Sequence, residues 1–261
     1  MKVGFIGLGN AGGKLAGSIL RNGFDLTVHD LNPSLVDEFI ERGAKSVGSP
    51  QEMAKRCDVV ITCLPSPKAC SEVMESSEGI LSGLSKGKIW LEMSTTDEAE
   101  IRRIGALVEA IGALPIDCPV SGGCHRADTG NISIFAGCSR DAFERALPIL
   151  TTMGRRVLHT GDLGTASTLK VMTNYLATVN LASIAEALTT MKMLGMDMNV
   201  TYEAIKASSG TSFVHETESQ VILNGSRDIS FTMDLVSKDI GIFNELAQRK
   251  GLDLEIAPLI V

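Results

Sequence analysis

Three glycines near the start of the chain have the spacing of a phosphate-binding turn. An apolar run, Lys2 to Ile6, leads directly into Gly7-Leu8-Gly9-Asn10-Ala11-Gly12, which has the pattern G-x-G-x-x-G. Gly7 permits a tight strand-to-helix turn, and Gly9 lets the backbone approach a pyrophosphate without a side chain in the way. Gly12 allows the new helix to pack closely on the strand, and the first N–H groups of that helix face the phosphates. The pattern predicts that residues 7–12 bind a dinucleotide.

An acidic residue follows at the expected distance. A second apolar run, Asp25 to His29, ends in Asp30, 23 residues after Gly7. A carboxylate here accepts a hydrogen bond from the 2′-hydroxyl of an adenosine ribose and repels a 2′-phosphate, whereas an arginine favours the phosphate. Because neither Leu31 nor Asn32 supplies a cation, the sequence predicts NAD rather than NADP. The alternative interpretation is a glycine-rich turn in an ordinary α/β domain.

Small and polar residues follow three further apolar runs. They are Leu64-Pro65-Ser66, Ser94-Thr95-Thr96 and Ser121-Gly122-Gly123. In an open parallel sheet, ligands collect outside the carboxyl ends of the strands, so these segments are candidate binding loops. We expect Leu64, Pro65 and Thr95 beside the cofactor, and the hydroxyls of the Ser94-Thr95-Thr96 segment close to where a nicotinamide ribose would lie. Ser121, Gly122 and Gly123 can present a hydroxyl and bare N–H groups to a substrate carboxylate.

A simpler interpretation exists for the first two of these segments. Serine and threonine are common helix N-caps, and Ser94 or Thr95 ahead of Glu98 fits a capping arrangement. Ser66 precedes a helical pattern in the same way. The sequence alone leaves capping and ligand binding open at both places.

Lys170 and Asn174 are the polar residues of an otherwise apolar helical stretch. They stand four residues apart and therefore share one face of a helix. Their apolar neighbours are Leu169, Val171, Met172, Leu176 and Val179. Burying an ammonium group is costly unless it is paired or used, which makes Lys170 a candidate catalytic residue. The alternative is a lysine whose stem packs on the protein while its amine reaches water.

The elements that would hold these residues alternate between strands and helices. The predicted strands are Val3–Ile6, Leu26–His29, Val59–Leu64, Ile89–Met93, Leu114–Asp117, Ile132–Ala136 and Val157–His159. The predicted helices between them are Lys14–Asn22, Pro33–Arg42, Pro50–Lys55, Ala69–Met74, Asp97–Ile111 and Arg140–Met153. This alternation predicts an α/β domain with a doubly wound, mainly parallel sheet.

After Gly164 the pattern becomes entirely helical. Residues Thr168–Leu194 are apolar on nearly every face, as in a helix buried between two domains or two subunits. Further helices are predicted at Val200–Ala207 and Leu235–Gln248. We therefore expect a dinucleotide-binding domain at 1–163 and an all-helical domain at 164–261. The chain ends in an apolar run after Pro258, from which we expect that a further helix follows.

The composition argues against several classes of partner. The net charge is −7, and neither half is basic, so nucleic acid is not expected as a partner. The six cysteines include no C-x-x-C pair and no zinc spacing; Cys118, Cys124 and His125 lie close in sequence but form no matching ligand set, so no metal is predicted. Neither a signal peptide nor a membrane-spanning segment is expected, and we expect a cytoplasmic protein with reduced cysteines.

Taken together, four motifs resemble the β-hydroxyacid dehydrogenase family. They are the N-terminal GLGNAGG, the segment DCPVSGG from Asp117, the pattern G-x₅-K-x₃-N from Gly164, and Phe231-x₆-Lys238-Asp239. They occur in order and cover essentially the whole chain. The family usually has methionine at Ala11, alanine at Cys118 and asparagine at Thr173, so the match is not complete.

The resemblance implies a Rossmann-type domain joined by a long helix to an all-helical domain. It implies that Lys170 is the catalytic lysine, that Asn174 and the loop of Ser121, Gly122 and Gly123 bind substrate, and that Lys238 contacts the cofactor. Such proteins are usually dimers or tetramers. The expected reaction moves a hydride between NAD(H) and a small 3-hydroxy acid or semialdehyde, with Lys170 as general acid and base.

Two other functions remain open at this point. The first is a non-catalytic module that keeps the dinucleotide fold for assembly or sensing, for which loss of the lysine would be expected. The second is a decarboxylating relative acting on phosphorylated sugar acids. It would need a basic cluster, for which Arg126, Arg155 and Arg156 are candidates, and the chain is short for it.

Overall fold

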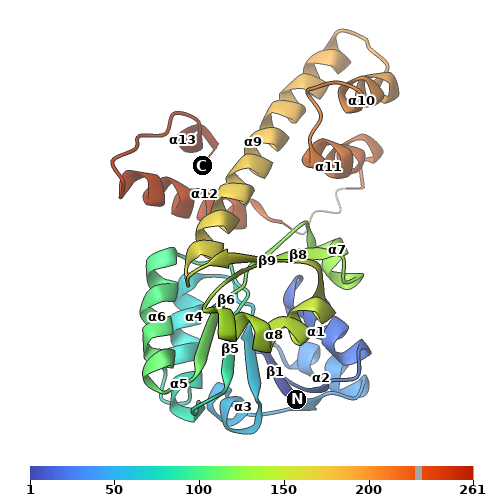
Figure 1. Cartoon of the computed structure of the whole chain (residues 1–261). Coiled ribbons are helices and arrows are strands. Elements are labelled where there is room, and N and C mark those ends of the chain that lie inside the picture. The colour runs from blue at the N-terminus through green and yellow to red at the C-terminus, as the bar shows by residue number, and fades with distance from the viewer. Residues whose placement is uncertain (227–230, 261) are drawn as a thin grey trace. The chain divides into compact units, whose positions relative to one another are not determined.

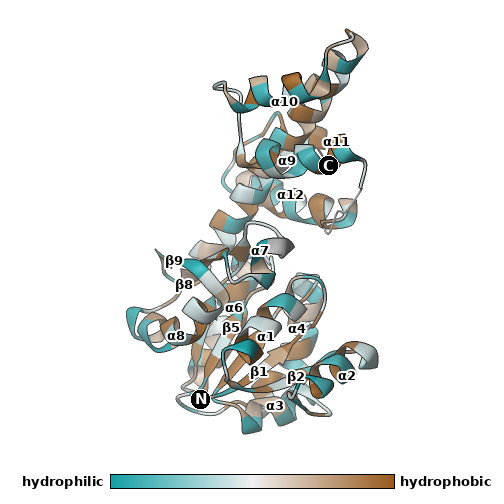
Figure 2. Ribbon diagram, turned by 90° about the vertical axis from the view of Figure 1, so that its right-hand side faces the viewer, coloured by the Kyte–Doolittle hydropathy of each residue, from teal (hydrophilic) through white to brown (hydrophobic). Residues whose placement is uncertain are grey.

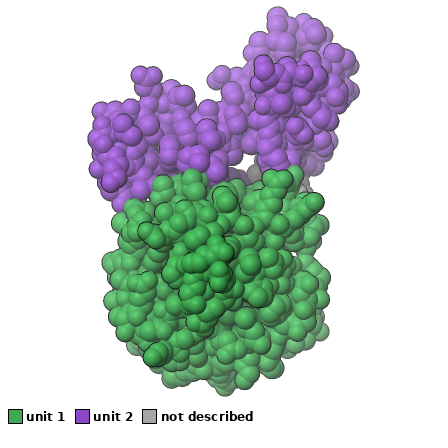
Figure 3. Space-filling view, in the orientation of Figure 1, with its two compact units in different colours: residues 1–170 green, residues 171–261 purple. Residues whose placement is uncertain are grey.

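A computed structural model describes residues 1–226 and 231–260, leaving aside the side chains of Cys124 and His125 (Figure 1). Val261 and the side chain of His125 therefore lie outside the described residues. The chain forms two compact units, Met1–Lys170 and Val171–Val261, drawn in different colours in Figure 3. The division falls within a long helix, whereas the sequence places it at 163/164; that domain boundary remains a prediction.

The first unit alternates strands and helices. Its strands are β1 (Lys2–Ile6), β2 (Asp25–His29), β3 (Lys45–Ser46), β4 (Val59–Thr62), β5 (Ile89–Glu92), β6 (Leu114–Asp117), β7 (Val120–Ser121), β8 (Ile132–Gly137) and β9 (Gly154–Gly161). Its helices are α1 (Gly12–Arg21), α2 (Pro33–Glu41), α3 (Pro50–Arg56), α4 (Pro67–Glu75), α5 (Ile80–Gly83), α6 (Glu98–Ala110), α7 (Cys124–Asp128) and α8 (Arg140–Met153). The sequence analysis did not predict β3, β7, α5 or α7, each of which is five residues or shorter.

All nine strands form a single sheet, in the order β3-β2-β1-β4-β5-β6-β8-β7, with β9 on β8. The first six in this order run parallel, with registers such as Val3↔Leu26 and Val3↔Val59. β8 pairs antiparallel with β6 and β7 and parallel with β9. The predicted mainly parallel sheet is therefore confirmed, and the order 3-2-1-4-5-6 is that of a Rossmann fold.

Helices cover both faces of this sheet because alternate strand residues point to opposite sides. Ile89 and Leu91 pack into a core with residues of α1, α2 and α8. Trp90, between them, packs into a second core with residues of α3, α4, α5 and α6. Figure 2 shows the central strands coloured as mostly hydrophobic residues, as expected for strands buried on both faces. The sheet is thus doubly wound.

The second unit is helical. It contains most of α9 (Thr165–Met193), followed by α10 (Met198–Lys206), α11 (Phe213–Asn224), α12 (Met233–Gln248) and α13 (Ala257–Ile260). A small core joins α12 and α13 through Val236, Ile240 and Ala257. Within this single chain α9 is not buried on every face, because Leu176, Leu181 and Met193 are exposed.

The sequence analysis did not predict α11. The residues that α11 buries include His215 and Ser219, which do not register as an apolar pattern. Their side chains bond each other at 3.0 Å, and the second ring nitrogen of His215 lies 3.0 Å from the carbonyl of Tyr202 on α10. The helix is fixed by buried polar contacts rather than by an apolar stripe. In the part of the chain that is described, no helix has the length and apolar character needed to cross a membrane.

Candidate active site

The sheet reverses its strand order between β1 and β4, which pair with each other near its centre. From β1 the chain proceeds outward to β2 and β3, then returns to β4 on the other side of β1. The loops that follow β1 and β4 therefore diverge at their carboxyl ends, and in open α/β sheets this is where ligands bind. Gly7 to Gly12 follow β1, and Leu64 and Pro65 follow β4 closely.

At two of the three glycines of the G-x-G-x-x-G pattern, neighbouring backbone lies too close to leave room for a side chain. Gly7 has a φ of 94°, and a Cβ placed on it would lie 2.3 Å from the carbonyl oxygen of Cys63. A Cβ on Gly12 would lie 2.0 Å from the carbonyl oxygen of Gly7. Gly9 differs, because a Cβ there would meet no atom within 4 Å. The protein's own packing thus requires Gly7 and Gly12, whereas the bare backbone at Gly9 faces open space.

Helix α1 begins without a side-chain cap. Its N-cap is Ala11, which makes no capping hydrogen bond. The other helices of the first unit with seven or more residues that begin after a loop are capped by side chains, from Asn32, Ser49, Ser66, Asp97 and Ser139. The first N–H groups of a helix have no partners within the helix and carry the positive end of its dipole. The start of α1 is therefore suited to bind an anion.

Asp30 connects β2 to this turn. Its Oδ2 accepts a hydrogen bond of 2.6 Å from the backbone N–H of Leu8, and its Oδ1 accepts one of 2.8 Å from the N–H of Asn32. The side chain of Leu31, between them, is 95% exposed. The structure thus brings the predicted acidic residue against the glycine-rich turn, with no basic side chain at positions 31 and 32.

A buried glutamate that the sequence analysis missed supports the loop after β4. Glu92 is fully buried and accepts hydrogen bonds of 2.8 Å from the N–H of Ser94 and from the hydroxyl of Thr62. The hydroxyl of Ser94 in turn accepts a bond of 2.7 Å from the N–H of Leu64. Burial raises the pKa of the Glu92 carboxyl above its usual value. The signal in the sequence is an acidic residue at the end of an otherwise apolar strand.

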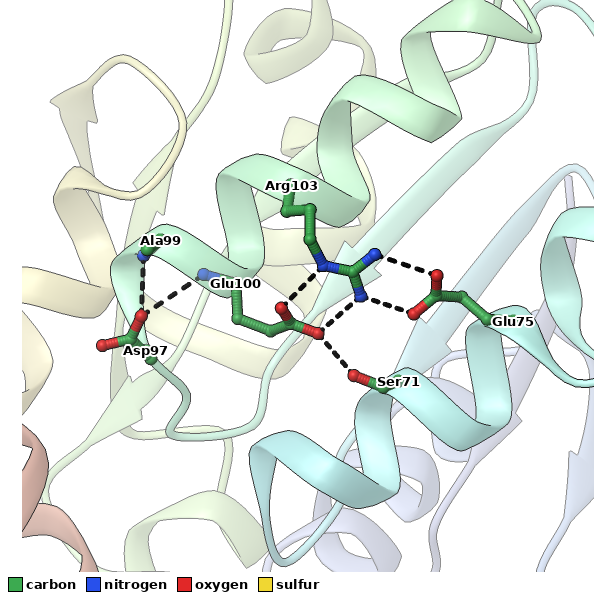
Figure 4. Close-up of polar contacts among 6 residues, drawn as sticks. All are labelled: Ser71, Glu75, Asp97, Ala99, Glu100 and Arg103. Atoms are coloured by element: carbon green, nitrogen blue, oxygen red, sulfur yellow. Dashed lines mark hydrogen bonds and ion pairs between the residues drawn. The ribbon is translucent and has the colours of Figure 1, made fainter.

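Capping explains Ser66 but not Ser94 or Thr95. Ser66 accepts a hydrogen bond from the N–H of Ala69 at the start of α4. Helix α6 is instead capped by Asp97, whose carboxylate accepts from Ala99 and Glu100 (Figure 4). The hydroxyl of Ser94 supports Leu64, as described above, and Thr95 is half-buried. Capping by Ser94 or Thr95 is therefore the wrong interpretation.

The two helices that follow these loops are joined at their surface. Figure 4 shows Arg103 of α6 between two carboxylates, with bonds of 2.9 and 2.5 Å to Glu75 of α4 and of 2.8 Å to each oxygen of Glu100. Ser71 of α4 also bonds Glu100. Hydrogen bonds from Arg103 lower the pKa of both glutamates. This exposed network links α4 to α6, the helices that follow the two loops.

Beyond β6 the chain forms the predicted Ser121–Gly123 loop. β7 pairs with β8 through Ser121↔Ser133, and Gly122 and Gly123 then have φ values of 121° and 87°. Glycine adopts such positive φ values readily, so the loop presents backbone without side chains at both positions. Asp117, at the end of β6, is completely buried and contacts α9 at Ser167.

The remaining predicted residues lie on α9 and α12. Lys170 is largely buried, with 9% of its surface exposed. In the second unit, Asn174 donates a hydrogen bond of 2.6 Å from Nδ2 to Oδ2 of Asp239, and Lys238 pairs with Oδ1 of the same carboxylate at 2.7 Å. Asp239 is 1% exposed. The structure thus joins Asn174 and Lys238 through a residue that the sequence analysis quoted in a motif but did not assign.

No group of three potential metal ligands occurs among the side chains that are described. The thiols of Cys118 and Cys138 are buried, and burial raises the pKa of both. These cysteines are therefore neutral residues of the core, whereas the side chains of Cys124 and His125 lie outside the description.

Two family models cover the chain. Residues 2–161 match the NAD-binding domain of 6-phosphogluconate dehydrogenase, and residues 164–260 match the NAD-binding domain of NADP-dependent 3-hydroxyisobutyrate dehydrogenase. Mouse mitochondrial 3-hydroxyisobutyrate dehydrogenase is 32% identical over 94% of this chain and 75% of its own length. The 2-(hydroxymethyl)glutarate dehydrogenase of Eubacterium barkeri is 31% identical over 99% of this chain and 86% of its own.

Further relatives agree in sequence and in structure. The NAD-dependent L-serine dehydrogenase of Pseudomonas aeruginosa is 33% identical over 95% of this chain and 85% of its own. The crystal structure of a 3-hydroxyisobutyrate dehydrogenase from Salmonella typhimurium superposes with a TM-score of 0.90 at 28% identity, covering 100% of this chain and 91% of that one. The chain therefore belongs to the β-hydroxyacid dehydrogenase family, enzymes that oxidise small hydroxy acids with NAD(P).

Proposed function

We propose that this protein is an NAD-dependent dehydrogenase of small 3-hydroxy acids, reversible toward the semialdehyde, with Lys170 as the general acid and base. The observation that carries the proposal is the burial of Lys170 at 9% exposure within the first turns of α9. A buried ammonium is costly in free energy unless it is paired or used in chemistry.

The cofactor fits the residues at the strand-order reversal. The uncapped start of α1 and the open space at Gly9 suit a pyrophosphate, held by the backbone of Gly7, Leu8, Gly9, Asn10, Ala11 and Gly12. Asp30 would accept from the adenosine ribose, and Leu64, Pro65 and Thr95 would lie beside the nicotinamide half. Lys238 would add a contact from the second unit. When bound, the cofactor supplies the hydride acceptor or donor.

NAD is proposed over NADP because of the charge at the end of β2. The carboxylate of Asp30 would repel a 2′-phosphate, and the exposed Leu31 beside it carries no positive charge that would offset this repulsion. Titrating the protein with NADH and with NADPH, followed by cofactor fluorescence, tests this. Tighter binding of NADPH would overturn the assignment.

The substrate class follows from what the relatives' substrates share. 3-Hydroxyisobutyrate, L-serine and 2-(hydroxymethyl)glutarate each carry a hydroxymethyl group on the carbon next to a carboxylate. We infer the same unit, HOCH₂–CHR–COO⁻, as the substrate here. Ser121, Gly122 and Gly123 would bind the carboxylate, and Lys170 would take the hydroxyl proton while the carbon loses hydride. Asn174, whose amide nitrogen is held by Asp239, would help to orient Lys170 and the substrate.

The decisive experiment compares wild type with Lys170→Ala. On a panel of the three named acids and their semialdehydes, wild type should turn over at least one, with absorbance at about 340 nm reporting the cofactor. Lys170→Ala should lose about 10²–10⁴-fold in kcat while still binding NADH. Lys192→Ala, near the end of the same helix, serves as a matched control. Near-normal turnover in Lys170→Ala would remove Lys170 from the mechanism.

We also propose a cytoplasmic homodimer or homotetramer that uses neither nucleic acid nor a membrane. Exposed Leu176 and Leu181 on α9 leave apolar surface that a second copy would cover. Light scattering coupled to size-exclusion chromatography measures the assembly directly. A monomer at micromolar concentration would contradict this proposal without affecting the proposed chemistry.

A further inference from the structure

A single carboxylate at the edge of the sheet holds the first turn of α9. Oδ1 of Asp117 accepts a hydrogen bond of 2.7 Å from the hydroxyl of Ser167, and Oδ2 accepts one of 2.7 Å from the N–H of the same residue. Asp117 is fully buried and Ser167 is 1% exposed. Ser167 lies in the first turn of α9, where a backbone N–H has no acceptor within the helix. The carboxylate fills that role and also faces the positive end of the helix dipole.

The same turn is packed directly on backbone. A Cβ on Gly137, at the end of β8, would lie 2.8 Å from the carbonyl oxygen of Asp162 and 3.1 Å from the nitrogen of Ala166. A Cβ on Gly164 would lie 2.9 Å from the side chain of Glu98 on α6. The start of α9 therefore has little freedom to shift, and Asp117 supplies its specific polar anchor.

Asp117 also lies at the end of β6, just before the Ser121–Gly123 loop. Ser121 follows it by four residues, and β7 ties that loop back to β8. Lys170 follows Ser167 by three residues, about one helical turn. Asp117 thus connects two segments. It is covalently continuous with the Ser121–Gly123 loop, the proposed carboxylate site, and two hydrogen bonds tie it to the turn of α9 that precedes Lys170, the proposed proton-transfer group.

We propose that Asp117 is a positioning residue for the reaction, setting the place of the Lys170 amine relative to the Ser121–Gly123 loop through its clamp on Ser167. This inference rests on the proposed function, because it requires Lys170 to move the proton. Misplacement of a reacting group by about 1 Å lowers turnover on the order of 10²-fold. Loosening the clamp should therefore reduce kcat more than it affects binding.

The clamp is sensitive to protonation. Burial raises the pKa of Asp117 to about 7. The titratable groups around it are Glu92 in register on β5 and the thiols of Cys118 and Cys138. Its other partners are the neutral Ser167 of α9 and Gly164, just before that helix. A protonated carboxyl loses acceptor capacity on one oxygen and no longer complements the helix dipole. The clamp should weaken as the pH falls through neutrality.

The test uses the full chain in the reducing direction, with NADH and the semialdehyde that wild type accepts. In this direction Lys170 acts as the acid, so its own protonation does not reduce turnover at low pH. Wild-type kcat should fall below about pH 7, the value to which burial raises the pKa of Asp117. Asp117→Asn should lower kcat on the order of 10²-fold and abolish that fall. KM and the dissociation constant of NADH should not change.

Two further variants make the result decisive. Ser167→Ala removes one of the two clamp bonds and should lower kcat about tenfold, and it decides the question if Asp117→Asn does not fold. Thr168→Ala, in the same turn, removes a hydroxyl that bonds the carbonyl of Gly164 rather than Asp117; it is the matched control and should keep the kcat of wild type. The inference would be overturned if Asp117→Asn kept the kcat of wild type and its fall below about pH 7. It would also be overturned if this variant lost NADH affinity by the same factor as kcat. Lys170→Ala is measured in the same assay. If Lys170→Ala stays active, the proposed function fails; if it is inactive while Asp117→Asn behaves as wild type, only the inference about Asp117 fails.

Discussion

The N–H of Leu8 and the carboxylate of Asp30 are joined by a hydrogen bond of 2.6 Å, which fixes the end of β2 against the glycine-rich turn after β1. The second oxygen of Asp30 accepts from Asn32. A carboxylate has about four lone-pair sites, so both oxygens can accept a further bond from a ribose hydroxyl. Asp30 thus shapes the turn and also offers a site for the ligand.

Replacing Asp30 should change the cofactor preference. Asp30→Asn removes the charge that repels a 2′-phosphate and weakens a charge-assisted bond worth about 1.5–3 kcal/mol. NADH affinity should fall by about 10–100-fold, which is that free energy expressed as a ratio, and the gap between NADH and NADPH should narrow. Fluorescence titration measures both constants. Asp37→Asn, exposed on α2, is the control, and an unchanged NADH/NADPH ratio in Asp30→Asn would count against the ribose contact.

Gly9 and Gly12 should respond differently to alanine. A Cβ on Gly12 would overlap the carbonyl oxygen of Gly7, so Gly12→Ala should lower the melting temperature. A Cβ on Gly9 meets no protein atom within 4 Å, so Gly9→Ala should melt as wild type does but bind NADH more weakly. Thermal melts and NADH titrations of both variants test the contrast. Full NADH affinity in Gly9→Ala would mean that this open space does not hold the pyrophosphate.

Glu92 should be needed for the fold of the loop after β4. Glu92→Ala leaves the buried N–H of Ser94 without its acceptor and leaves the hydroxyl of Thr62 only the carbonyl of Leu91, at 3.4 Å. A buried group without an acceptor costs about 1–3 kcal/mol. Glu92→Gln keeps an acceptor and should cost less. Trp90 is the sole tryptophan and donates a bond of 2.9 Å to Thr62, so its fluorescence reports the change. Equal unfolding free energies for the alanine and glutamine variants would refute this account.

Stability should depend on pH through Asp117. The pKa of an aspartate in an unfolded chain is about 3.9, whereas burial raises that of Asp117 to about 7 in the folded protein. The folded state therefore binds the proton more tightly, because neutralising the buried carboxyl removes a desolvation cost that outweighs its hydrogen bonds to Ser167. The stabilisation that comes from this proton is complete below about pH 4 and lost as the pH rises through 7.

Denaturant unfolding followed by Trp90 fluorescence from pH 5 to pH 8 measures this dependence. The unfolding free energy of wild type should decline with rising pH more steeply than that of Asp117→Asn. Asp141→Asn, at an exposed position on α8, should decline like wild type. Parallel curves for wild type and Asp117→Asn would show that Asp117 does not titrate in this range.

The sequence by itself determined the fold class and the glycine-rich turn. The parallel sheet follows from short apolar runs that alternate with helical patterns, and Gly7, Gly12 and Asp30 are identified by spacing along the chain. Those features depend on local backbone conformation and on residues close in sequence. Short elements such as β3 and β7 escaped prediction because two residues carry no periodic signal.

Only the tertiary structure decided which buried carboxylates support the site. Glu92 and Asp117 face each other in register on β5 and β6, and their partners Thr62 and Ser167 lie 30 and 50 residues away in sequence. Asp239 likewise joins Asn174 to Lys238 across 65 residues. Such contacts depend on strand register and on where a helix begins, so no local pattern encodes them. Their hydrogen-bond geometry exists only once distant segments have packed together.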